Sequence, residues 1–188
     1  MPKHRSMLIN VSHFTLIQDQ VKDIIDFALR GIQEDIRSYS SLKVSEAIKN
    51  KTISELRAVY EKYYSDRGCT WEQVQRELVT AVLPVEVRSV NQKSGGASLN
   101  YALYKDNGLR VIAVGGNSLA RGLTLEGLCV SYFYRSTQMY DALLQMGRWF
   151  GYRTGYEDLT KIWMPLETIN WYSLISEATS WDCDVPII

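Results

Sequence analysis

The sequence is poor in residues that build cross-linked or repetitive scaffolds. Its 188 residues include 4 prolines, 12 glycines and 3 cysteines, which excludes a collagen-like or low-complexity chain. Cys69, Cys129 and Cys183 form no CxxC pair, so the sequence predicts neither a disulfide framework nor a zinc site. No charge of one sign predominates, because 21 Lys and Arg residues are balanced by 21 Asp and Glu residues. A site for a polyanion must therefore be a local cluster of cations.

Long hydrophobic runs are also missing. The apolar segments reach only about half the length of a membrane span. No long apolar stretch with a cleavage site follows the N-terminal MPKHRS. We therefore expect a cytoplasmic protein with no membrane partner. Hydrophobic residues still make up 46% of the chain, which excludes disorder and suits a single domain over residues 1–188.

Short apolar runs alternate with amphipathic helical patterns. This alternation predicts an α/β fold with a mostly parallel sheet covered on both faces. Capping-box spacing occurs at Thr15/Gln18, Thr52/Glu55 and Thr70/Gln73. The region 44–83 is predicted to be a helical insertion that Pro84 closes. The expected strands are 7–11, 85–90, 109–114, 129–134 and 161–164, and the expected helices outside the insertion are 15–36, 137–147 and 169–178.

Ligands of open α/β sheets bind outside the carboxyl ends of the strands. Four segments at such ends are rich in Gly, Ser, Asn or Arg: 12–15, 91–98, 115–122 and 147–155. Gly116, Asn117 and Ser118 follow a strand directly, where glycine lets a nucleic-acid backbone approach closely. A plain tight turn is the alternative interpretation of these three residues.

The cations between positions 110 and 153 are all arginines. The planar guanidinium group suits phosphate and stays charged, so this stretch favours phosphate recognition. Internal ion pairs with Glu126 or Asp141, the two acidic residues of the stretch, are the alternative. The arginines are Arg110, Arg121, Arg135, Arg148 and Arg153.

Other nucleotide-binding signals are absent from the sequence. It contains no GxxxxGK[ST] loop and no strand that ends in adjacent carboxylates able to hold magnesium. We therefore expect no metal site, and we expect the chain alone to be unable to bind and turn over a nucleotide.

Two neighbouring segments resemble helicase motifs. Residues 111–134, with Ala120-Arg121-Gly122-Leu123-Thr124, are similar to motif V of superfamily 2 helicases, and residues 143–156 are similar to motif VI. The run GGNSLARGLTLEGL, followed by QMGRWFGYR and GYEDL, resembles the Z-one endonuclease domain family. That family is described as a superfamily 2 helicase relative found in bacterial restriction and defence proteins.

The resemblance implies the second, three-layer RecA-like lobe of a two-lobe motor. ATP and Mg²⁺ would then be bound mainly by a preceding N-terminal RecA-like lobe, the first expected partner. DNA and other restriction or defence subunits are the further expected partners. The motif VI arginines Arg148 and Arg153 would supply the arginine finger, although they lie five positions apart instead of the usual three.

The resemblance also implies roles for residues outside the finger. Thr124 stands where motif V usually has Asp, which removes or weakens a carboxylate contact. The implied nucleotide-binding residues are Arg121, Gly122, Thr124 and Gly147. Ser12 and His13 correspond to motif IV, which contacts a nucleic-acid backbone, and Asn91 and Ser94 are similar candidates.

Two alternative functions remain open from the sequence. Glu157 and Asp158, with Lys161 nearby, have the composition of a metal-dependent nuclease site. The chain can also be a non-catalytic interaction module that retains a degenerate motor fold.

Overall fold

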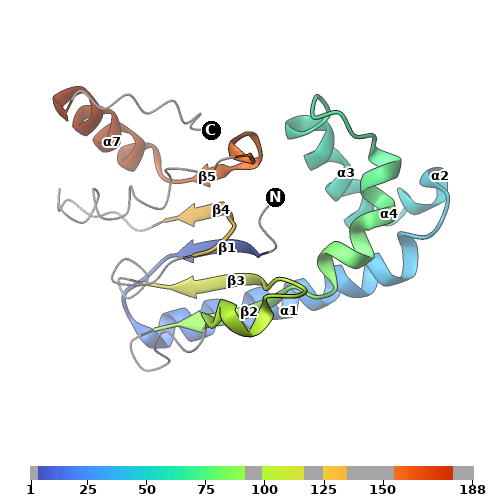
Figure 1. Ribbon diagram of the computed structural model, residues 1–188, viewed down its shortest axis with the longest axis horizontal. Helices are drawn as coiled ribbons and strands as arrows, with labels where there is room; N and C mark the ends of the chain where they lie inside the picture. Colours follow the sequence, from blue (N-terminus) through green and yellow to red (C-terminus); the bar gives the residue numbers. More distant parts are fainter. Residues whose placement is uncertain (1–3, 92–98, 117–124, 135–154, 180–188) are drawn as a thin grey trace. The chain divides into compact units, whose positions relative to one another are not determined.

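The computed structural model describes residues 4–91, 99–116, 125–134 and 155–179. Its five strands form one parallel sheet in the order β2-β3-β1-β4-β5 (Figure 1). The predicted α/β class and parallel sheet are therefore confirmed. The strands are β1 (Arg5–Asn10), β2 (Glu86–Val90), β3 (Arg110–Gly115), β4 (Leu128–Phe133) and β5 (Lys161–Trp163).

Strand β1 lies at the centre of the sheet. It pairs with β3 on one side and with β4 on the other, and both pairings are parallel. A central parallel strand is covered on both faces, which explains why β1 is a continuous apolar run. Leu8 of β1 is fully buried. The core around it contains Val90, Leu99, Tyr101, Leu109, Val111, Ala113, Leu125, Leu128 and Phe133.

The chain divides into two compact units, one of residues 1–22 and 87–188 and the other of residues 23–86. The first contains nearly all of the sheet. The second is helical and includes α2 (Val44–Ala47), α3 (Lys51–Tyr63) and α4 (Trp71–Val82). Its own core consists of Ile36, Ala47, Ile53, Trp71 and Leu78.

Helix α1 (Thr15–Tyr39) runs from the first unit into the second and begins where the sequence predicts. The capping box predicted for Thr15 and Gln18 is wrong, because Thr15 is already helical. The side-chain amide of Gln18 instead donates to the carbonyl of Ser12 at 2.9 Å. Further along, the Gln33 side-chain amide lies within 3.0–3.2 Å of the carbonyls of residues 82, 83 and 85, so α1 also fixes the end of α4.

The other two predicted caps have different outcomes. In α4 the capping box is confirmed: Thr70 accepts from the amide of Gln73, whose side chain accepts from the amide of Thr70. The box predicted at Thr52 is wrong, because Asn50 caps α3. Thr52 lies inside the helix, where its hydroxyl donates to the Asp35 carboxylate.

The C-terminal part of the described chain contains β5 and helix α7 (Leu166–Thr179). Two short 3-10 turns, η2 (Tyr101–Tyr104) and η3 (Glu157–Leu159), have no counterpart in the sequence-based expectation. The helix predicted at 137–147 lies outside the described residues. Across the described ranges, no helix has the length and apolar character needed to cross a membrane.

Candidate functional site at the carboxyl edge of the sheet

The strand order defines where a ligand would bind. After β1 the chain crosses to β2, the outer strand on one side of the sheet. After β4 it crosses to β5, the outer strand on the opposite side. Neighbouring strands whose connections diverge in this way leave a crevice outside their carboxyl ends. Asn10 ends β1 and is in register with Gly115 of β3 and Phe133 of β4. The candidate site is therefore built around the end of β1.

A tight turn follows β1 at this edge. The Ser12 hydroxyl accepts a hydrogen bond from the Phe14 amide at 3.1 Å, and the Gln18 side chain holds the Ser12 carbonyl. The turn leaves His13 and Phe14 exposed, with their ring centroids 3.8 Å apart. The Ser12 hydroxyl thus has a structural role, and the two rings are the groups available to a ligand.

Gly116 packs directly beneath this turn. A Cβ atom at this position would lie 2.7 Å from both the Ser12 carbonyl oxygen and the Gln18 side-chain nitrogen. Because glycine has no side chain, the chain that follows β1 and the chain that follows β3 can pack directly against each other here. Gly116 therefore lies beside Ser12 and His13, more than 100 positions earlier in the sequence, at the same edge of the sheet.

Asn91 lies at the end of β2 and is 9% exposed. Its side-chain amide donates to the Ser89 hydroxyl at 3.3 Å, and that hydroxyl donates to the Asp19 carboxylate at 2.7 Å. These bonds connect the end of β2 to the first turns of α1. Asn91 lies at a strand end, as the sequence predicts, and its hydrogen bond there helps to hold β2 against α1.

Two buried amide oxygens at this edge accept no hydrogen bond from the residues that the structure describes. Asn10 is 1% exposed and Gln18 is 2% exposed, and neither Asn10 Oδ1 nor Gln18 Oε1 has a donor in that part of the chain. An unsatisfied buried acceptor typically costs about 1–3 kcal/mol, and such groups are uncommon in native proteins. Sequence reasoning missed both residues, and it missed Phe14. For Asn10 a signal existed, because it is the polar end of the apolar run Met7-Leu8-Ile9.

The remaining site predictions lie outside the described residues. Among them are both finger candidates and the residues assigned to motif V. They are Ser94, Asn117, Ser118, Arg121, Gly122, Thr124, Gly147, Arg148 and Arg153.

The residues of the nuclease alternative are described. Glu157 and Asp158 lie in the short turn η3, where the Glu157 carboxylate accepts the amide of Gly155 at 3.0 Å. In the described parts of the chain, no three His, Cys, Asp or Glu side chains are grouped so that they could hold a metal ion. The geometry of these residues therefore provides no support for metal-dependent cleavage.

Comparison with known proteins gives a family assignment. No curated protein and no solved structure matches the chain. A sequence model of the Z1 domain matches residues 1–181, which is nearly the whole chain. The match includes every strand of the sheet and the candidate site at its carboxyl edge. The chain therefore belongs to the Z1 domain family.

Proposed function

We propose that this chain is the second, RecA-like motor lobe of an ATP-dependent superfamily 2 helicase or translocase. The enzyme would act on DNA as part of a bacterial restriction or defence endonuclease. The observation that carries the proposal is that Ser12, His13 and Gly116 lie together at the carboxyl ends of β1 and β3 in a parallel sheet. Membership of the Z1 domain family is compatible with an enzyme of endonuclease type.

The edge supports contact with a nucleic-acid strand. The exposed rings of His13 and Phe14 offer a surface on which bases can stack, and stacking tolerates any sequence. In this proposal the two rings stack on the bases of a strand, and arginines supply the phosphate contacts.

The division of labour in hydrolysis follows from the chemistry. Phosphoryl transfer depends mainly on positioning and charge neutralisation. The N-terminal lobe would hold ATP and Mg²⁺, and Arg148 or Arg153 would neutralise developing charge when the lobes close. The present chain would therefore hydrolyse no ATP by itself.

The first test uses the full-length protein with both lobes. Gly116→Ala places a methyl group against the Ser12 carbonyl and should weaken DNA binding at least tenfold. Gly31→Ala is the matched control, because open space surrounds Gly31 and alanine suits helix α1. If the two variants bind DNA with equal affinity, the carboxyl edge of the sheet is not the DNA-binding site.

The second part of the test measures DNA-stimulated ATP hydrolysis. Arg148→Ala and Arg153→Ala are compared with wild type, and at least one should lose tenfold or more, a change of about 1.4 kcal/mol in activation free energy. Robust turnover by the isolated chain would refute the two-lobe division. Weak DNA binding that does not respond to salt would favour the non-catalytic interaction module.

A further inference from the structure

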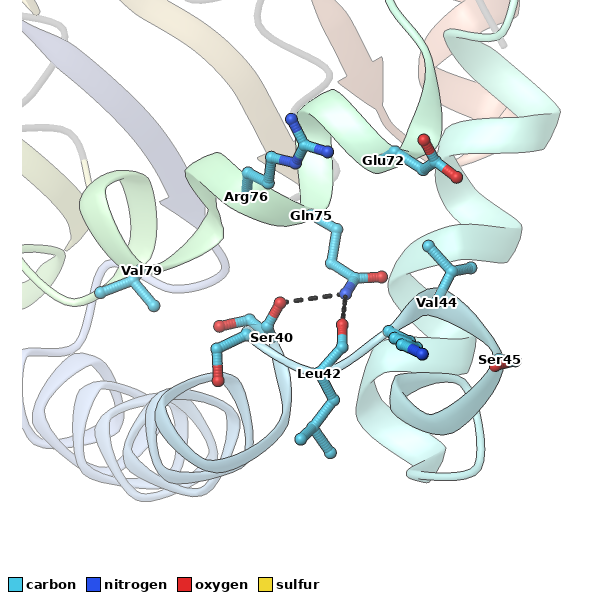
Figure 2. Close-up of a pocket in the computed structure, with 10 residues that line it drawn as sticks. Ser40, Leu42, Val44, Ser45, Glu72, Gln75, Arg76 and Val79 are labelled. Atoms are coloured by element: carbon cyan, nitrogen blue, oxygen red, sulfur yellow. Dashed lines mark hydrogen bonds between the residues drawn. The ribbon is translucent and has the colours of Figure 1, made fainter.

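The helical unit of residues 23–86 contains a pocket that the motor function does not use. The pocket has a volume of about 770 Å³, within the range of ligand-binding cavities. One wall is residues 40–45, which form the connection from α1 to α2 and the start of α2, and the other is one face of α4 (Figure 2). All of its lining residues belong to this unit, so the pocket is complete within it.

A buried glutamine fixes the two walls against each other. Gln75 of α4 is 3% exposed, and its side-chain nitrogen donates to the carbonyls of Ser40 at 3.0 Å and Leu42 at 2.9 Å (Figure 2). Its side-chain oxygen accepts from the Trp71 indole at 3.1 Å. Every polar atom of the Gln75 side chain therefore has a structural partner. The pocket is thus formed before a ligand arrives, which lowers the entropic cost of binding.

Two cations line the pocket without an ion pair. Lys43 on the connection and Arg76 on α4 are exposed, and neither contacts an acidic group among the described residues. Glu72 precedes Arg76 by one helical turn, a spacing that favours pairing. Figure 2 nevertheless shows the two side chains leaving α4 without meeting. Other pairs at this spacing in the same unit do form: Asp26 with Arg30, Lys51 with Glu55, and Arg57 with Glu61.

The remaining lining adds hydroxyl groups and a small apolar area. Ser41 and Ser45 are exposed beside Lys43, and each carries a hydroxyl that can donate to an anion. Leu42 and Val79, which are 44% and 38% exposed, supply apolar surface. With one carboxylate against two cations, the lining carries a net positive charge. Such a lining suits a phosphate group, which accepts hydrogen bonds and carries negative charge.

We propose that this pocket binds a phosphate-bearing ligand, with Lys43 and Arg76 as its charge contacts and the serine hydroxyls as donors. A phosphodiester of a single nucleic-acid strand and a free phosphate compound share this chemistry. The proposal does not depend on the motor function, because no residue of the pocket belongs to the carboxyl edge of the sheet.

The test compares Lys43→Gln/Arg76→Gln with a control of equal charge loss, Arg30→Gln/Lys51→Gln, in the full chain. The control cations lie on exposed helix faces outside the pocket. The first probe is a fluorescein-labelled 20-mer of deoxythymidine, followed by anisotropy at several salt concentrations. The second probe is inorganic pyrophosphate, followed by its effect on the melting temperature. Circular dichroism checks that both variants keep their helices.

We expect the pocket variant to bind the oligonucleotide about tenfold more weakly, with its salt slope reduced by about 1.4 for two lost phosphate contacts. The control should stay within about twofold of wild type. If the variant loses only the stabilisation by pyrophosphate, the ligand is a free phosphate compound. If pocket variant and control behave alike with both probes, the proposal is overturned.

Discussion

Tyr101 connects the start of the central strand to the sheet core. Its hydroxyl lies 2.8 Å from the Ser6 hydroxyl, and its ring packs edge-on against His4 with centroids 4.9 Å apart. Burial is the main cause that raises the pKa of Tyr101 above its ordinary value, and the hydrogen bond with Ser6 lowers it by a smaller amount. The neutral phenol is therefore the form that the folded protein accommodates.

This raised pKa predicts how stability depends on pH. Tyr101 keeps its proton in the folded chain at a pH where the unfolded chain has lost it, so the unfolded state binds fewer protons. The stabilisation is complete below about pH 10 and is lost as the pH rises through the folded-state pKa. Urea unfolding between pH 8 and 11 measures this decline. It should be smaller in Tyr101→Phe, and an equal decline would show that other groups cause it.

The residues of the candidate site differ in how far the sequence determines them. Ser12, His13 and Gly116 are placed by a simple rule, since the ends of parallel strands share one edge. The position of the Gln18 side chain does not follow from this rule, because the spacing from Thr15 to Gln18 fits a capping box equally well. Only the folded chain shows that Gly116 leaves room for the Gln18 side chain to reach the Ser12 carbonyl.

The helix starts show why local patterns predict some elements and miss others. Three matches to S/T-x-x-E/Q stand where the sequence predicts a helix to begin, but of these only Thr70 and Gln73 form the reciprocal bonds. At Thr52 a nearby Asn50 takes the cap, and Asp35, seventeen positions away, accepts the hydroxyl. The strands were predicted to within a residue or two, because their apolar runs are bounded by turns. A tertiary partner for a polar side chain has no such local signal.

The cap of α4 gives a prediction at the scale of this helix. Thr70→Ala removes the acceptor of the Gln73 amide and should lower the free energy of unfolding by about 1 kcal/mol. Ser54→Ala is the control, because Ser54 is exposed inside α3 and alanine has the higher helix propensity. Denaturant unfolding followed by circular dichroism measures both. A loss of equal size in the two variants would contradict the role of the cap.

For the whole molecule, the two cores come from separate stretches of chain. The core of the helical unit consists only of residues between 36 and 78, and the sheet core uses none of them. Proteins with such division can open one unit while the other keeps its protected amides. Local stability should therefore differ between the sheet and helices α3 and α4.

Gly127 allows this difference to be tested. Its φ is +63°, and a Cβ there would overlap the His4 carbonyl, so Gly127→Ala should destabilise the sheet by about 3 kcal/mol or more. Gly155→Ala, with φ +86° and open space, should cost only about 1–2 kcal/mol. Hydrogen exchange should show faster exchange in β1 and β4 of Gly127→Ala, with α3 and α4 unchanged. Uniform loss of protection would indicate one cooperative unit.

The central position of β1 has a consequence for biosynthesis. The ribosome makes β1 before the other strands of this sheet, and the strands on either side of it, β3 and β4, follow much later in the sequence. His4, just before β1, accepts a hydrogen bond from the amide of Leu109, 105 positions further along the chain. During that interval both hydrogen-bonding edges of a hydrophobic segment have no sheet partner, a state that invites aggregation. The helices of residues 23–86 make local contacts and can fold while translation continues. Nascent chains of this protein should therefore depend on chaperones most strongly before β3 leaves the exit tunnel.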